Sequence, residues 1–297
     1  MTVREYRDCD LVVDSRLDLA EGPVWGSALE SCLYWVGILD GSVHRFDFRT
    51  NVHDRWEVGQ PVGSLAIRQS GGLLLAIQDG FATMDLESQA ISLVAPVELD
   101  DKSQRMNDGS CDAAGRFWAG TMSAGDAIEG SGSLYQLDAD GSVLCKLRGI
   151  TISNGIGWSP DDTTMYFVDT PTRRIDAFDF NATDGRILNR RCVVEIPQDS
   201  GSLDGLAVDE EGFVWVAVWG AGEVRRYSPQ GEHVSSLKLP VTAPSSCAFG
   251  GDDLETLYVT TARLSLTPDE VIAQPTAGGI YGANVGVRGC PVAMAAF

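Results

Sequence analysis

Length, composition and charge set the first limits on this chain. It has 297 residues, of which 44% are hydrophobic and 22% charged, as is usual for a soluble globular protein. A formal net charge of −20 argues against a nucleic-acid partner, because phosphate binding needs a surface rich in Lys and Arg.

Hydropathy along the sequence bears on where the protein is expected to act. No stretch approaches the ~20 apolar residues of a membrane span, and the start MTVREYRDCD has no signal-peptide core. The seven cysteines form no CxxC pair, which favours reduced thiols in a reducing compartment. We therefore expect a cytoplasmic protein with no membrane partner, acting as a monomer or weak dimer.

A short β-rich unit recurs along the chain. Each copy begins at one residue, which we call its anchor, and continues into an apolar strand, a turn and a strand with aromatic residues. The anchors are Glu21, Val62, Asp108, Asn154, Asp204 and Ser245. The strands expected after them are 32–40 and 42–48, 72–80 and 81–86, 115–122 and 132–141, 164–170 and 174–180, 212–220 and 223–231, and 256–262 and 278–283.

The spacing of the anchors predicts the fold class. Successive anchors are 41, 46, 46, 50 and 41 residues apart, and several strands per period of this length are typical of a β-propeller. No linker is visible, so we expect an all-β, six-bladed β-propeller over residues 1–297. Residues 11–19 should form a strand that pairs with the last blade and closes the ring.

Two smaller features complete the prediction of structure. Thr267, followed by Pro and two acids, is typical of a helix start, so 267–273 should form one short surface turn. The strand 32–40 alternates large residues on both faces, which is typical of burial between neighbouring blades. His44, His53 and His233 show no metal-ligand spacing and are interpreted as surface residues.

The anchors are also the candidate site. Equivalent residues of successive blades lie on a ring around the axis, so three acids and one amide would face one another there. Carboxylates this close raise one another's pKa, and an all-oxygen set suits a hard divalent cation. Asn-Gly and Asp-Gly are also common turn pairs, so either Asn154 or Asp204, considered singly, could be no more than a turn residue. Glu-Gly has no preference for turns, so this alternative does not explain Glu21.

The same segments resemble a known family. EGPVW, RMNDGSCDAAGRFWAGTM, ISNGIGWSPDDTTMYFVDT and SLDGLAVDEEGFVWVAVW are similar to motifs of the senescence-marker-protein, gluconolactonase and regucalcin family. The resemblance runs from about residue 11 to 285. It implies a six-bladed propeller and a metal-dependent hydrolase of sugar aldonolactones, such as gluconolactone, which are opened to aldonic acids.

The resemblance also implies roles for individual residues. Glu21, Asn154 and Asp204 would hold one divalent ion, with Ca²⁺ expected first and Zn²⁺, Mn²⁺, Mg²⁺ or Fe²⁺ as alternatives. Asp204 would be the catalytic base, and Asp108 would lie beside the ion. Arg105 and Asn107 would bind the hydroxyl groups of the sugar lactone.

One segment departs from the family pattern. Animal regucalcins carry a sugar-contacting glutamate after the GTM segment, where this chain has Gly125. Asp126 or Glu129 would then take over this contact, on a loop (123–133) that could act as a lid. Two other functions stay open: a phosphotriesterase or aryl-ester hydrolase of similar build, and a non-enzymatic calcium-binding regulatory protein.

Overall fold

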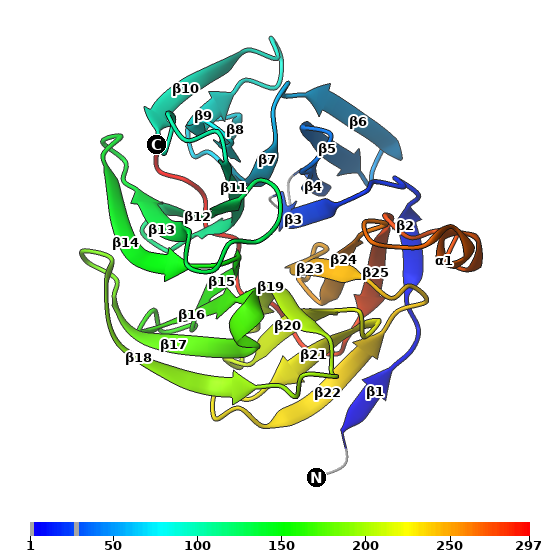
Figure 1. Ribbon diagram of the computed structural model, residues 1–297. Helices are drawn as coiled ribbons and strands as arrows, with labels where there is room; N and C mark the ends of the chain where they lie inside the picture. Colours follow the sequence, from blue (N-terminus) through cyan, green and yellow to red (C-terminus); the bar gives the residue numbers. More distant parts are fainter. Residues whose placement is uncertain (1–2, 27–29) are drawn as a thin grey trace.

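The structure is a computed structural model that describes residues 3–26 and 30–297. Six sheets, antiparallel except for one short edge strand, are arranged around a central axis (Figure 1), so the chain is an all-β, six-bladed β-propeller. The first strand of each blade contacts the first strands of both neighbouring blades, which places these six strands around the channel. They are β3 (Ala20–Trp25), β7 (Val62–Ile67), β11 (Gln104–Cys111), β15 (Ser153–Trp158), β19 (Ser202–Val208) and β23 (Pro244–Gly250).

Each blade continues outward with three more strands in order. Blades one to three contain β4 (Cys32–Gly37), β5 (Ser42–Asp47) and β6 (Val52–Glu57); β8 (Leu73–Ile77), β9 (Gly80–Met84) and β10 (Ile91–Pro96); and β12 (Phe117–Ser123), β13 (Gly132–Leu137) and β14 (Val143–Ile150). Blades four and five contain β16 (Thr164–Asp169), β17 (Arg174–Asn181) and β18 (Arg186–Glu195); and β20 (Val214–Trp219), β21 (Glu223–Tyr227) and β22 (His233–Lys238).

The sixth blade joins the two halves of the chain. It consists of β23, β24 (Thr256–Thr261), β25 (Ile280–Asn284) and the early strand β2 (Asp10–Val13), which pairs antiparallel with β25. A three-residue strand, β1 (Arg4–Tyr6), adds in parallel to β22 of the fifth blade. The N-terminal segment therefore covers the outer edges of two blades, which would otherwise expose unpaired backbone groups.

Helical structure is short in the described residues. A 3-10 helix, η1 (Thr170–Thr172), follows β16, and α1 (Pro268–Ala273) lies between β24 and β25. Thr267 caps α1, as the Thr-Pro-Asp-Glu sequence predicted. Glu270 also completes a capping box with Thr267. No helix in the described ranges is long and apolar enough to span a membrane.

The apolar core lies between blades. Along β4, Leu33 and Trp35 pack toward the sixth blade, whereas Tyr34 and Val36 pack toward the second. This confirms the prediction that the strand is buried on both faces. Equivalent apolar clusters lie between the other neighbouring blades, and the seven cysteines are free thiols.

The interpretation of the histidines as surface residues is wrong for His44. The residue is 2% exposed, and its ring stacks on Trp35. Its Nε2 lies 2.8 Å from Ser42 Oγ, and its Nδ1 lies 3.0 Å from His53 Nε2. Burial is the largest cause that lowers the pKa of His44, to about 3, and His53 adds to it. His44 is therefore a neutral residue of the blade packing.

Candidate functional site

All six first strands are irregular at their anchors. The pairing of each strand with the second strand of its blade shifts register at or beside the anchor, which is the signature of a β-bulge. A bulge bends the strand and redirects the side chain at that position. The repeated irregularity places the six anchors at equivalent points around the channel.

The glycines that follow the anchors have a packing reason. A Cβ atom on Gly63 would lie 2.2 Å from Asn107 O, one on Gly155 would lie 2.7 Å from Asp204 O, and one on Gly205 would lie 2.1 Å from Ser246 Oγ. Only glycine allows the first strands to approach one another this closely. The Asn-Gly and Asp-Gly pairs are therefore parts of β15 and β19, and the turn interpretation of Asn154 and Asp204 is wrong.

The polar anchors form a buried group, which we call the polar ring: Glu21, Asp108, Asn154 and Asp204. Their exposed fractions are 4%, 8%, 5% and 7%. The other two anchors contribute little polarity, because Val62 has no polar side-chain atom and the Ser245 hydroxyl is hydrogen-bonded to Ala20 O and Thr260 Oγ1.

Burial and mutual repulsion disfavour negative charge in the polar ring. Burial is the largest cause that raises the pKa of both Glu21 and Asp204 well above the usual range; Asp204 and Asp108 raise the pKa of Glu21 further, and Asp108 raises that of Asp204. Burial also raises the pKa of Asp108 to about 6. The guanidinium of Arg105 attracts Glu21 and Asp204, although burial lowers its own pKa to about 10.

A chain of hydrogen bonds crosses the ring from the third blade to the fifth. Arg105 Nη1 donates to Asn107 Oδ1 (2.6 Å), and Asn107 Nδ2 donates to Asn154 Oδ1 (2.8 Å). Asn154 Nδ2 donates to Thr170 Oγ1 (2.7 Å), whose hydroxyl donates to Leu203 O (2.9 Å). The last acceptor in this series of hydrogen bonds, Leu203 O, belongs to the residue immediately before Asp204. The structure thus brings Arg105, Asn107 and Asn154 together.

The donor set fits a divalent cation. Asp204 Oδ1 is buried and has no hydrogen-bond partner among the described residues, which is costly for a polar atom unless something else binds it. Within the described residues, no three His, Cys, Asp or Glu side chains converge closely enough to hold a metal by themselves. A cation would therefore need the amide oxygen of Asn154 beside the carboxylates of Glu21 and Asp204, together with water.

Asp126 and Glu129 lie apart from this group. Both are exposed on the loop between β12 and β13, and no hydrogen bond in the described structure joins them to the polar ring. The loop itself lies at the ring's end of the channel, because Ala124 N donates to Ser103 O and Gly130 N donates to Thr151 Oγ1. Its role as a lid stays a prediction.

Sequence reasoning missed Thr170. Its only local signal is its position directly after β16, where it begins the short helix η1 together with Pro171. The hydrogen bonds that give it a role come from Asn154 and Leu203, 16 and 33 residues away. No short sequence pattern could show these partners.

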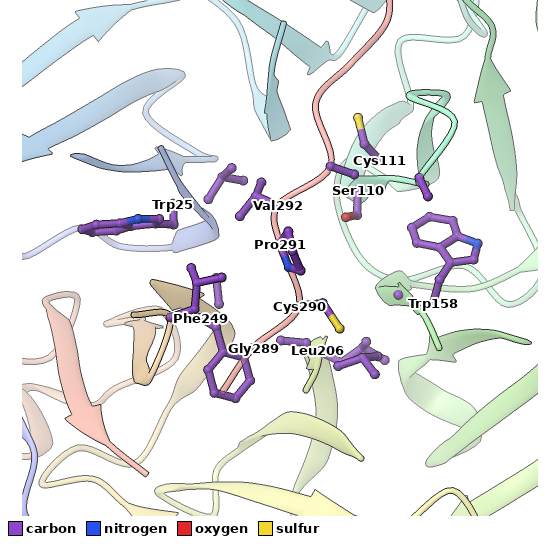
Figure 2. Close-up of a pocket in the computed structure, with 18 of the residues that line it drawn as sticks. Trp25, Ser110, Cys111, Trp158, Leu206, Phe249, Gly289, Cys290, Pro291 and Val292 are labelled. Carbon is purple, nitrogen blue, oxygen red and sulfur yellow. The ribbon is translucent and has the colours of Figure 1, made fainter. Parts of the chain in front are cut away.

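The opposite end of the channel is hollow and mostly apolar. A cavity of about 630 Å³ is lined by the far ends of the six first strands, including Trp25, Trp158, Leu206 and Phe249. Figure 2 shows the chain around Pro291 passing across it. Backbone hydrogen bonds hold this C-terminal segment, residues 286–297, on both sides of the cavity. Gly289 N donates to Leu254 O, and Ala295 N donates to Ile67 O. None of the polar-ring residues lines this cavity.

Fold and site together define a class: six-bladed propellers with an acid-rich site at one end of the axial channel. The chain belongs to the SMP-30/Gluconolactonase/LRE-like family, whose model matches residues 19–263. Regucalcin of Xenopus laevis is 38% identical over 293 residues, covering 96% of this chain and 98% of its own.

Solved structures agree with this assignment. A calcium-binding protein, regucalcin, from Agrobacterium tumefaciens has a TM-score of 0.94 and 29% identity, covering 99% of both chains. A gluconolactonase from Xanthomonas campestris has a TM-score of 0.72 at 22% identity, covering 92% of this chain and 88% of its own; this likeness supports the fold alone.

Proposed function

We propose that this protein is a metal-dependent lactonase that hydrolyses a sugar aldonolactone, such as gluconolactone, to the aldonic acid. The observation that carries the proposal is a carboxylate oxygen of Asp204 with no hydrogen-bond partner among the described residues. It is buried in the same polar ring as Glu21 and Asn154. Family membership supports the same reaction class, since the family is named in part for gluconolactonase.

Glu21, Asn154 and Asp204 would hold the cation, with Ca²⁺ the ion we expect first because all three ligands are oxygens. When bound, the cation would supply Lewis-acid stabilisation of the negative charge that develops on the lactone carbonyl oxygen, and would lower the pKa of nearby water. Its charge would also offset the burial and the mutual repulsion that raise the pKa of Glu21 and Asp204. Asp108 would add negative charge beside these ligands.

Asp204 would be the general base. The Gly205 N–H donates to its carboxylate, while Oδ1 has no hydrogen-bond partner in the part of the chain that the structure describes. That oxygen could accept the proton of the attacking water and return it to the ring oxygen as the lactone opens. The reaction then consumes one water and leaves the free carboxylic acid and hydroxyl of the product.

Arg105 would orient the sugar. Its Nη1 group bonds Met106 O and Asn107 Oδ1, which leaves Nη2 and Nε to address hydroxyl groups. Asn107 would contribute less directly, because Nδ2 already donates to Ser153 O and Asn154 Oδ1. It could reach a hydroxyl only through the remaining lone pair of Oδ1.

A substrate panel tests the proposal. Aldonolactones with five and six carbons, an unsubstituted lactone, an aryl ester and a phosphotriester would be assayed with native and chelator-treated protein. We expect hydrolysis of the aldonolactones, its loss with chelator, and its return when Ca²⁺ or Mn²⁺ is added. A preference for the phosphotriester or aryl ester would contradict the sugar-lactone assignment.

A calcium-binding regulatory protein is the second candidate. The Agrobacterium relative is described as a calcium-binding protein, and the polar ring alone would suffice for that role. The same panel separates the two functions: a protein that binds Ca²⁺ but turns over no lactone would be a binding protein. Family membership favours the enzyme, since the family is named in part for gluconolactonase.

A further inference from the structure

We infer that Thr170 is a positioning residue that fixes the amide orientation of Asn154, so that the oxygen and not the nitrogen is presented to the cation. This inference rests on the proposed function, since it concerns the same ligand set. Asn154 is the one member of that set whose two terminal atoms differ chemically, and its amide nitrogen cannot serve as a ligand.

The direction of each hydrogen bond in the series from Arg105 to Leu203 is determined by the groups at its two ends. Leu203 O can only accept, so Thr170 uses its single hydroxyl proton there (2.9 Å). Thr170 Oγ1 can then only accept from Asn154, which must place Nδ2 on that side (2.7 Å). Thr170 can therefore bind the amide nitrogen of Asn154 but not its oxygen.

The other end gives the same orientation. The Arg105 guanidinium has no acceptor, so Asn107 must present Oδ1 to it (2.6 Å) and Nδ2 to Asn154 (2.8 Å). Asn154 therefore faces Asn107 with Oδ1. A carbonyl oxygen has two lone pairs, so Oδ1 can accept this bond and still bind a cation.

Thr170 is itself held firmly. It begins η1, its N–H donates to Ile152 O (3.2 Å), and its carbonyl accepts from Arg173 N (3.0 Å). The preceding residue, Asp169, is 4% exposed and accepts from the N–H groups of Thr151 and Ile152. The hydroxyl therefore sits on a fixed backbone at the edge of blade four.

Thr170→Val is the direct test, because valine keeps the shape and removes the hydroxyl. It leaves Asn154 Nδ2 buried without an acceptor, and it removes one of the two contacts that distinguish the amide orientations, so that only the bond from Asn107 Nδ2 still favours the oxygen. Loss of a partner that orients a metal ligand typically weakens metal affinity about 10- to 100-fold. Calorimetric titration of the metal-free protein with Ca²⁺ should show this loss, whereas Thr170→Ser, which keeps the hydroxyl, should stay within about threefold of wild type.

A double-mutant cycle separates orientation from a merely structural role. In an Asn154→Asp background both terminal atoms are oxygens, so orientation no longer matters. Thr170→Val should then change the Ca²⁺ affinity by less than about threefold. An equal loss in both backgrounds would show that Thr170 only supports the local fold, and would overturn the inference.

Two further outcomes keep the tests distinct. If the wild type binds Ca²⁺ and Thr170→Val binds it with the same affinity, this inference is wrong and the proposed function still stands. Absence of any divalent-ion binding by the wild type would overturn both. Circular dichroism and thermal unfolding would check each variant, and Thr170→Ala would replace Thr170→Val if valine prevented folding, with the same expected loss.

Discussion

The two ends of the central channel are formed by the same six strands and differ in chemistry. At their beginnings, β-bulges collect the polar ring, in which three acids and an amide are 4–8% exposed. At their far ends, the strands line an apolar cavity of about 630 Å³ that the C-terminal segment crosses. The first end brings together acidic groups whose charged forms are unfavourable there. The far end buries apolar surface and supplies hydrogen bonds to the backbone of the C-terminal segment.

This difference suggests that the beginning of each strand serves ligand binding and that its far end serves stability. Buried, mutually repelling carboxylates lower the stability of a fold unless a ligand compensates for them. Apolar burial, in contrast, is the main favourable contribution to folding. Changes at the ring should therefore affect ligand binding and catalysis, whereas changes at the far end should affect stability.

The largest expected effect is at the ring. Glu21→Gln, Asn154→Ala and Asp204→Ala should each lose the bound cation and reduce kcat/KM on aldonolactones by roughly 100- to 1,000-fold or more, as expected when the group that stabilises developing charge is removed. Circular dichroism should remain native. Asp140→Ala, which removes an exposed acid from a turn, serves as the control and should behave like wild type. Wild-type turnover by Asp204→Ala with metal bound would contradict its role as base.

The far end should show the opposite pattern. Phe249 is 4% exposed, lines the cavity and packs on Trp215. Phe249→Ala should lower the free energy of unfolding by about 3–5 kcal/mol, measured by chemical denaturation, with Ca²⁺ affinity unchanged. Phe249→Leu is the milder control, expected to cost less than about 1.5 kcal/mol. Loss of metal binding without loss of stability would show that the two ends are coupled.

Arg105→Ala tests substrate positioning within the ring. Loss of a charge-assisted hydrogen bond to the sugar should reduce kcat/KM by roughly one to two decades, or about 1.5–3 kcal/mol. Metal affinity should stay close to that of the wild type, because removal of a cation leaves the ring more negative and Thr170 still accepts from Asn154 Nδ2. An unchanged kcat/KM on sugar lactones would remove Arg105 from the substrate site.

The blade packing between the two ends should show its own pH dependence. His44 is neutral when folded, with a pKa lowered from 6.5 to about 3, so the unfolded chain binds more protons below pH 6.5. The contribution of this residue to stability should be constant above that pH and fall as the pH decreases, by up to about 1.4 kcal/mol per pH unit. Thermal unfolding between pH 7.5 and 5 would measure it, and His44→Leu should flatten the profile. An equal slope in that variant would assign the effect to other groups.

The smallest expected effect concerns the loop between β12 and β13. Asp126→Ala and Glu129→Ala should change the ranking among five- and six-carbon aldonolactones and leave hydrolysis of an unsubstituted lactone unchanged. The reason is the position of this exposed loop at the ring's end of the channel. Identical rankings for the wild type and both variants would show that the loop is not part of the substrate site.

The repeat was readable from the sequence because its signal is local. Each anchor is followed by strands with alternating burial, and the spacing alone predicts six blades. The features that were missed depend on distant partners. His44 is polar in the sequence but stacks on Trp35; β1 is only three residues long and is defined by its pairing with β22. Thr170 acquires its role from hydrogen bonds that only the folded chain creates.

The most direct test of the account is a titration of metal-free protein with Ca²⁺ while aldonolactone hydrolysis is followed in the same samples. We predict binding of one ion per chain, with activity that rises in proportion to occupancy and reaches its plateau at one equivalent. Full activity in the metal-free protein, or saturated binding with no hydrolysis of any aldonolactone, would contradict the proposal that the polar ring is a metal-dependent lactonase site.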